Sequence, residues 1–550
     1  MDSPNIIFEN ASIVDGTGKP AWKGEVAVRR DRIVAMGKRL PEGFKNGAER
    51  VNAEGRVLAP GFVDIHAHGE LEPLADTSAA GKVVEGVTTE ISGNCGLTPF
   101  PLLGALRGRF EKEARDEYGW KPFQLDWSSA SEYFERLERA GCSINRGFLA
   151  GHGSLRAAVN GYGDNPLGED GKRLMRNLLE DSLNAGCYGL STGLAYPPGC
   201  YATPEEIGDL AAICARKDAL YTSHMRSESD GLEAAITETL DVCRKSGART
   251  QISHLKTALQ RNWKKIEFLD KTLHQARRDG LDFHADRYPY TASSTGLDSI
   301  LPNWAYIGGN AEELKRLKDK SMSAKLEREV AAKNPEADFW RRIQVAAVTN
   351  EALRAEISGK NMAEIAAAWK VRPFEAFRRI AIEDELRTSA IFSSMCEENL
   401  ERILSWEFVM VASDATARNI SGPTRVAAPH PRTFGTFPRM LAKYVRERKL
   451  MSLEEAIRRM TSLPAQTFHI ADRGAIRPGA YADLVLFDAE TVRDEATFTD
   501  ANRFPTGIDR VYVNGVLAVK EGTVLAARAG RVLRHGQSSS ASLTPVVVAA

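Results

Sequence analysis

The feature that most constrains this chain is a series of short apolar segments that run directly into metal-binding or carboxylate side chains. They are VDIHAH with His66 and His68, ISGNC with Cys95, TSH with His224, ISH with His254, and VASD with Asp414. Residues two apart on a strand point to the same face, so His66 and His68 are predicted to present both imidazoles to one spot. Zinc is bound by His, Cys thiolate and carboxylate side chains, and a catalytic zinc keeps one position open for water. The pattern indicates a metal-dependent hydrolase.

The middle of the chain alternates strand-like with helix-like segments. The predicted strands are GFVDIHAH, TTEISGNC, GFLAGHG, CYGLSTG, ALYTSH, ARTQISH, LDFHADRY and FVMVASD. Their nearly continuous β-branched and aliphatic content is typical of parallel strands covered on both faces. We therefore predict an α/β fold with a (β/α)₈ TIM-type barrel, whose active sites lie at the carboxyl ends of the strands. A doubly wound sheet is disfavoured, because it would bring ligands from only a few neighbouring strands.

The two ends of the chain differ from the middle. Residues 1–60 and 471–534 contain short strand-like segments between turns, and we predict that they form one small β-sandwich beside a barrel of residues 61–470. The stretch around 289–390 is too long for a βα loop and is predicted to be an inserted lid or subdomain. Because SAIFSSM (389–395) also reads as a strand, either it or LDFHADRY is the seventh barrel strand. Residues 535–550 are predicted to be a disordered tail, since they offer too little to bury.

Composition excludes some classes of partner. The chain has 73 Lys+Arg and 73 Asp+Glu residues, and this balance argues against nucleic acid, which needs a basic surplus. No apolar run approaches the ~18 residues of a membrane helix, and the N-terminus lacks a secretory pattern. The seven cysteines are scattered without a CxxC pair, so most are expected to be buried thiols in a cytoplasmic protein.

Each candidate ligand has a structural alternative. A lone histidine is more often a satisfied core group, but an HxH pair after an apolar strand has few structural reasons to exist. Cys95 could be an ordinary buried thiol, yet its Gly-Asn-Cys-Gly turn at a strand end favours a thiolate ligand. Asp414 could cap a following segment, and it is interpreted as a general base because the other strand ends supply the metal. Structural roles are expected for His274, His284, His469 and His535, whereas His152 could also lie beside the site.

Two cationic residues lie next to these segments. Most Lys and Arg side chains are solvated, but Lys256 and Arg432 lie on loops of the predicted active face. Arg suits bidentate capture of a carboxylate. Tyr288, Tyr290 and Ser294, in DRYPYTASSTG, could add hydroxyl contacts or could form a plain aromatic turn.

Taken together, the segments resemble the N-acyl-D-amino-acid deacylases, or D-aminoacylases, of the amidohydrolase superfamily. The resemblance is carried by PGFVDIHAHG, GVTTEISGNCG, GLSTGLAYPPG, YTSHMRSE, ISHLK, ADRYPYTASSTG, ASDA, HPRTFGTFPR and LPAQTFHIADRGAIRPGAYADLVLFD. These segments span nearly the whole chain up to GRVLR. The resemblance implies a (β/α)₈ barrel with a small β-sandwich, in agreement with the strand pattern.

The resemblance also implies roles for individual residues. A tightly held Zn²⁺ is implied on Cys95, His224 and His254, and a second, weaker position on His66 and His68 with Cys95 shared. Asp414 is implied as the catalytic acid/base. Substrate contacts are implied for Lys256, Tyr288, Ser294 and Arg432. Related superfamily members bridge two metals with a lysine from the fourth strand, but CYGLSTG has none, so the cysteine is expected to take the bridging place.

The expected activity is zinc-dependent hydrolysis of a small-molecule N-acyl-D-amino acid to a carboxylate and a free D-amino acid, and the D configuration rests wholly on the resemblance. One alternative is another amidohydrolase, acting on cyclic amides as dihydropyrimidinases and hydantoinases do, or acting as a deaminase. A non-catalytic scaffold is a different class, and it predicts eroded ligands, whereas all five candidate ligands and the aspartate are present.

Overall fold

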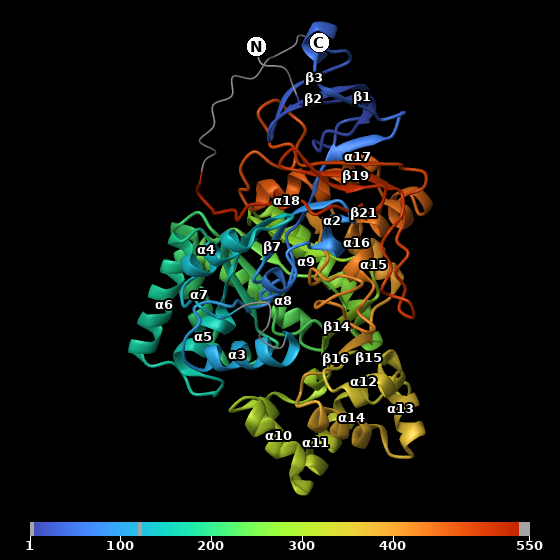
Figure 1. Cartoon of the computed structure of the whole chain (residues 1–550). Coiled ribbons are helices and arrows are strands. Elements are labelled where there is room, and N and C mark those ends of the chain that lie inside the picture. The colour runs from blue at the N-terminus through green and yellow to red at the C-terminus, as the bar shows by residue number, and fades with distance from the viewer. Residues whose placement is uncertain (1–4, 119–123, 538–550) are drawn as a thin grey trace.

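The computed structural model describes residues 5–118 and 124–537. Figure 1 shows a β-rich part built from both chain ends at the top, a barrel in the centre and a helical insertion at the bottom. The predicted tail lies mostly outside the described residues, which end at Gln537.

Eight strand positions form the central barrel. They are β6 (Phe62–Asp64), β7 (Val87–Ser92), β8 (Asn145–Phe148) continued by β9 (Ala150–Gly151), β10 (Gly189–Gly193), β11 (Leu220–His224), β12 (Thr250–Ile252), β13 (Phe283–Arg287) and β17 (Val409–Val411). Neighbouring strands pair in parallel. The barrel closes beyond the ends of β17 and β6, where the Asp414 amide donates to the His66 carbonyl at 2.8 Å. The predicted TIM-type barrel is confirmed, with a strand in each of the eight predicted segments.

Helices cover the outside of the barrel. The main ones are α4 (Ala130–Ala140), α6 (Glu169–Asn184), α7 (Pro204–Arg216), α8 (Leu232–Ser246), α9 (Ile266–Arg278), α15 (Glu397–Ser405) and α17 (Leu453–Met460). In α7, the Thr203 side chain caps the first turn and Pro204 occupies its first position. Ile207, Leu210 and Cys214 follow at helical spacing and are buried. An apolar stripe of this kind attaches a helix to the barrel wall.

The seventh barrel strand is β13, not the SAIFSSM segment. That segment forms β16 (Ser389–Ser393), which pairs antiparallel with β14 (Ala292–Gly296) and β15 (Ile343–Ala347). The same insertion holds α10 (Asn310–Lys318), α11 (Lys320–Lys333), α12 (Glu351–Ile357), α13 (Met362–Trp369) and α14 (Pro373–Glu383). Its apolar side chains form a cluster of their own, so the insertion is a folded unit rather than a long loop.

Both chain ends contribute to one mixed sheet. Its strands are β1 (Ile6–Ile13), β2 (Trp22–Arg29), β3 (Arg32–Gly37), β4 (Glu49–Asn52), β5 (Val57–Pro60), β18 (Leu484–Phe487), β19 (Ile508–Val513), β20 (Val516–Lys520) and β21 (Thr523–Val524). The two ends meet where β5 pairs antiparallel with β18. This sheet forms the small β domain, while domain boundaries at residues 60, 470 and 534 remain a prediction.

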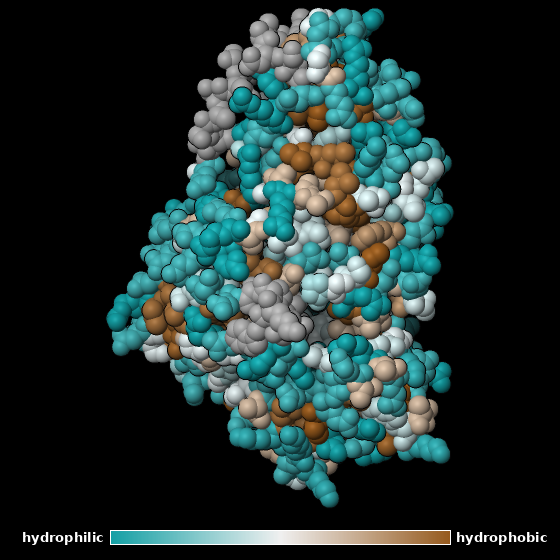
Figure 2. All heavy atoms as spheres, viewed as in Figure 1, coloured by the Kyte–Doolittle hydropathy of each residue, from teal (hydrophilic) through white to brown (hydrophobic). Residues whose placement is uncertain are grey.

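Among residues 5–118 and 124–537, no helix has the length and apolar character needed to cross a bilayer. Figure 2 shows mostly hydrophilic residues on the visible face, with a brown apolar cluster below the β-rich part at the top.

A buried carboxyl, Glu313, is expected to make the stability of the insertion depend on pH. Glu313 on α10 is only 2% exposed, and its Oε1 atom has no hydrogen-bond partner among the described residues. Burial and the neighbouring Asp298 carboxyl raise the pKa of Glu313 above its ordinary value of 4.5. The folded state therefore keeps a proton that the unfolded chain releases, so this group destabilises the fold increasingly as pH rises above that value.

Replacing Glu313 by Gln is expected to raise the midpoint of thermal unfolding by about 1–2 °C at about pH 8, and to have little effect near pH 4.5. The neutral amide removes the cost of keeping a proton on the buried carboxyl, and this cost grows as pH rises above 4.5. Thermal unfolding at the two pH values measures the difference. The matched control is Glu312→Gln, next to it on α10, because the Glu312 pKa is lowered by its hydrogen bond from Lys315. An equal effect of Glu313→Gln at both pH values would contradict the assignment.

Candidate metal centre and active site

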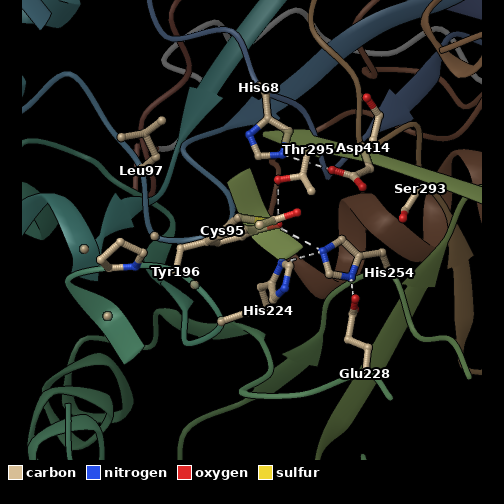
Figure 3. A pocket seen from close by; sticks show the side chains of 18 of the residues that line it. His68, Cys95, Leu97, Tyr196, His224, Glu228, His254, Ser293, Thr295 and Asp414 are labelled. Carbon is tan, nitrogen blue, oxygen red and sulfur yellow. Dashed lines mark hydrogen bonds and ion pairs between the residues drawn. The ribbon is translucent and has the colours of Figure 1, made fainter. Parts of the chain in front are cut away.

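The candidate site lies at the carboxyl ends of the barrel strands, where side chains from distant parts of the chain point into one pocket (Figure 3). Two groups of potential ligand atoms occur there, and within each group the atoms lie within 4.8 Å of one another. The first comprises Cys95, His224 and His254, and the second comprises His66, His68, Cys95 and Asp414. The structure thus brings together all six residues that the strand ends predicted, and Cys95 belongs to both groups.

Cys95 lies at the centre of the two groups. Its Sγ is 3.5 Å from His254 Nε2 and 3.4 Å from His66 Nε2, and His254 Nε2 is 2.9 Å from His224 Nδ1. Burial alone would raise the pKa of the Cys95 thiol, but the His66 and His224 imidazoles outweigh burial and hold that pKa well below its ordinary value. A thiolate beside several imidazoles is a donor set that suits zinc, so the residues present fit the implied metal.

The last position of the fourth barrel strand has no room for a side chain. Gly193, the last residue of β10, packs so closely on the Cys95 carbonyl that an added Cβ would collide with it. Gly96 packs from the other side, where a Cβ would lie 2.7 Å from the Gly193 nitrogen. Backbone therefore fills the space at the end of β10, and the bridging role of Cys95 remains a prediction.

Three of the site residues have strained backbones. Cys95, His254 and Asp414 adopt positive φ angles of 53°, 35° and 50°. A left-handed conformation costs a residue with a Cβ about 1 kcal/mol, and such residues cluster at functional sites. All three lie two or three residues beyond the end of a barrel strand, so each turn out of the strand directs a side chain into the pocket.

Asp414 is buried among positive partners. Its Oδ2 accepts from Arg432 Nη1 at 2.7 Å, and its Oδ1 lies 3.0 Å from His68 Nε2 and 3.3 Å from His66 Nε2. Burial would raise the pKa of the Asp414 carboxyl, but Arg432 and His66 outweigh burial and bring it well below its ordinary value. The carboxylate is therefore ionised and able to accept a proton.

The predicted substrate contacts line the same pocket, which has a volume of about 400 Å³. Tyr288 is fully buried, yet its hydroxyl has no hydrogen-bond partner among the described residues. The Arg432 guanidinium lies over its ring at 4.7 Å, and Arg432 Nη2 donates to the Ser294 carbonyl at 3.4 Å. Lys256 lies 5.8 Å from the same ring, in an ion pair with Glu228. A buried hydroxyl without a hydrogen-bond partner, next to two cations, is typical of a binding site for a polar ligand.

Two carboxylates that support the ligands were missed by sequence reasoning. Asp286, at the end of β13, lies 3.1 Å from His66 Nδ1, and Glu228 lies 2.7 Å from His254 Nδ1. A carboxylate on the second ring nitrogen fixes the tautomer and orientation of a metal-binding histidine. The available signal was the position of both acids next to predicted site segments, in LDFHADRY and YTSHMRSE.

Other histidines do not line the pocket. His152 is buried and pairs with Glu206 at 2.8 Å, so it has a structural partner. His430 was not singled out from sequence, but its Nδ1 accepts from the Arg432 amide at 3.0 Å and fixes the start of α16 (Arg432–Arg439). Tyr290, a possible hydroxyl contact, instead reaches the Pro431 carbonyl at 3.4 Å.

Comparison with known proteins identifies the class. The model of the amidohydrolase family matches residues 49–356 and 422–519. The chain therefore belongs to the amidohydrolase family, and it is a hydrolase that acts on amide C–N bonds.

Individual relatives indicate which amidohydrolases this chain is similar to. The chain is 35% identical to an N-acyl-D-glutamate deacylase and 31% identical to a D-aminoacylase, both from Alcaligenes xylosoxydans xylosoxydans, over 96–97% of this chain and 97% of each relative. Among solved structures, it is similar to an N-acyl-D-glutamate deacylase from Bordetella bronchiseptica complexed with zinc and a phosphonate inhibitor. That match has a TM-score of 0.80 and 32% identity and covers 97% of this chain and 100% of the other. A structure described for the binuclear metal centre of D-aminoacylase matches with a TM-score of 0.79. These matches support a metal cofactor for this chain.

Replacing Glu228 by Gln is expected to weaken zinc binding by about tenfold, because the His254 ring loses the charged acceptor that orients it. Competition with a chromophoric chelator measures the change. Glu233→Gln, on the exposed start of α8, is the matched control and should leave the affinity unchanged. Equal zinc affinity in the Glu228 variant and the wild type would show that Glu228 does not orient His254 for zinc binding.

Proposed function

We propose that this chain hydrolyses N-acyl-D-amino acids to a carboxylate and a free D-amino acid, with zinc as the cofactor. One observation carries the proposal: a thiolate–imidazole donor set, the Asp414 carboxylate and the Arg432–Tyr288 pair lie in a single pocket. The D configuration is supported by the relatives, which are an N-acyl-D-glutamate deacylase and a D-aminoacylase.

The proposed metal ligands are Cys95, His224 and His254 for a tight Zn²⁺ position, and His66 and His68 with shared Cys95 for a weaker one. Zinc bound there would supply a Lewis acid that brings the pKa of water towards ~7. Asp414 takes the proton of the attacking water. It then delivers this proton to the leaving nitrogen, which would otherwise depart as an unstable amide anion.

The cationic side of the pocket positions the substrate. Arg432 binds the α-carboxylate of the substrate, with help from Lys256, Ser294 and the Tyr288 hydroxyl. Holding the carboxylate fixes the position of the scissile amide relative to Asp414. This orientation lowers the entropic part of the activation barrier.

Substrate binding also changes the affinity of the Asp414 carboxylate for a proton. In the free site Arg432 pairs with Asp414 at 2.7 Å and helps to hold its pKa down. A substrate carboxylate that takes over the guanidinium weakens this pair, so the affinity of Asp414 for a proton rises when substrate is present. Asp414 is therefore a stronger base in the substrate complex than in the free site.

The alternative of a cyclic-amide hydrolase is less well supported. Hydantoinase and dihydropyrimidinase structures match at only 14–15% identity, with TM-scores of 0.51–0.55, and this likeness concerns the fold alone. The fourth-strand segment, CYGLSTG, also contains no lysine.

Acidic side chains are the favoured subclass of substrate. Arg109, on α3 (Gly104–Tyr118), also lines the pocket, where its guanidinium interacts with the Tyr162 hydroxyl and the Glu113 carboxylate. Tyr162 lines the same pocket. A guanidinium next to a hydroxyl suits a second carboxylate of the substrate.

The Asp414→Asn variant is expected to lose about a thousandfold in kcat while it retains zinc, because the amide cannot accept the proton of water. The Cys95→Ala variant should lose both zinc and activity. Metal analysis and steady-state kinetics on the same preparations separate the two cases. Substantial turnover by Asp414→Asn would show that the role of Asp414 is misassigned.

A substrate panel tests the specificity. N-acetyl-D-glutamate and N-acetyl-D-aspartate are expected to be hydrolysed better than N-acetyl-D-leucine, and L-isomers, hydantoins and dihydropyrimidines poorly or not at all. Replacing Arg109 by Gln should lower kcat/KM for the two acidic substrates by about tenfold relative to the neutral one, because it removes the guanidinium partner. Preference for an L-isomer would overturn the proposed reaction, whereas an equal loss on all three substrates would overturn only the role of Arg109.

A further inference from the structure

A third cluster of metal-binding side chains lies away from the pocket. Asp218, His469 and His535 offer ligand atoms that lie within 4.8 Å of one another. Asp218 precedes β11 and His224 ends it, so this cluster and the pocket lie at opposite ends of the same barrel strand. The proposed reaction makes no use of these three residues.

The cluster joins three regions that are far apart in the sequence. Asp218 follows α7, His469 follows α18 (Ser462–Thr467), and His535 belongs to the last described segment. The backbone amide of each residue donates a hydrogen bond to a carbonyl. The Asp218 amide donates to Ala215 at 3.2 Å, and the His469 amide donates to Gln466 at 3.2 Å. The His535 amide donates to Gly186 at 2.9 Å. The three side chains are therefore carried by fixed backbone.

The side chains already face one another. His469 Nδ1 lies 3.0 Å from Asp218 Oδ2, and the His469 and His535 rings stack with centroids 6.2 Å apart. The other oxygen of Asp218 lies 3.5 Å from Arg249 Nη2, which holds the carboxylate in place and also brings a competing positive charge. The Asp218 and His469 side chains are 70% and 39% exposed, so water can complete a coordination sphere.

We propose that Asp218, His469 and His535 bind one Zn²⁺ ion that clips the C-terminal segment to the base of the barrel. Two imidazoles and a carboxylate with open positions for water form a donor set that zinc accepts. The segment is already docked, because the Arg146 amide donates to the Arg531 carbonyl at 2.8 Å and the Leu533 amide donates to the Arg146 carbonyl at 2.7 Å. An ion bound only by the docked arrangement stabilises that arrangement.

The test compares zinc stoichiometry in matched variants of the full chain. Wild type, His469→Asn, His535→Asn and the control His274→Asn are dialysed against buffered micromolar zinc, and bound metal per chain is measured by mass spectrometry. His274 is a suitable control, since it is partly exposed and pairs with a carboxylate, Asp270, without a second histidine. We expect His469→Asn and His535→Asn each to bind one zinc fewer than wild type and His274→Asn, with deacylase activity within about twofold of wild type, because the pocket is untouched.

A second measurement follows the segment itself. Zinc should slow amide hydrogen exchange in residues 533–537 of the wild type and of His68→Asn, a pocket variant, but not of His469→Asn. Equal zinc stoichiometry in wild type and His469→Asn, or exchange that zinc does not change, would overturn the clip. Either result would leave the proposed deacylase reaction intact, because the two sites share no residue.

Discussion

The arrangement of the site depends on one buried carboxylate, Asp286, at the end of the seventh barrel strand. It accepts from Gln251 Nε2 at 2.5 Å and from the His254 amide at 2.9 Å, and it faces His66 Nδ1 at 3.1 Å. A buried carboxylate without partners costs several kcal/mol, so these contacts stabilise the fold only when all of them are made together. A single charge thereby holds one residue of each proposed metal position in a fixed orientation.

The strand pattern predicted the barrel because its parallel strands are buried on both faces and leave a continuous apolar signal. The seventh strand was ambiguous for a physical reason. β13 and β16 are both five residues long, but β16 has a more exposed pattern, because it lies in the antiparallel sheet of the insertion. Its partners, β14 and β15, lie about a hundred and about fifty residues before it, and a local pattern cannot reveal pairing over such distances.

The sequence predicted those site residues whose side chains can bind metal or protons and which stand at the end of a strand. HxH, Cys95 and Asp414 each stood where a strand ends, and that position is a property of the local sequence. Glu228 and Asp286 gave a weaker signal, because an acid next to a strand is usually solvated, and only tertiary contacts bury these two against His254 and His66. The strained φ angles of Cys95, His254 and Asp414 were also invisible, since none of these residues is a glycine that would signal a left-handed turn.

The free pocket is organised as pairs of opposite charge. Lys256 pairs with Glu228, and Arg432 pairs with Asp414. An anionic substrate must therefore exchange one partner for another rather than bind to an unopposed cation, which reduces the net gain from any single contact. The exchange also links recognition to chemistry, because the group that Arg432 releases is the proposed base. In the proposed mechanism, a ligand without a carboxylate leaves the Arg432–Asp414 pair intact, so it is disfavoured at the step of proton transfer as well as at binding.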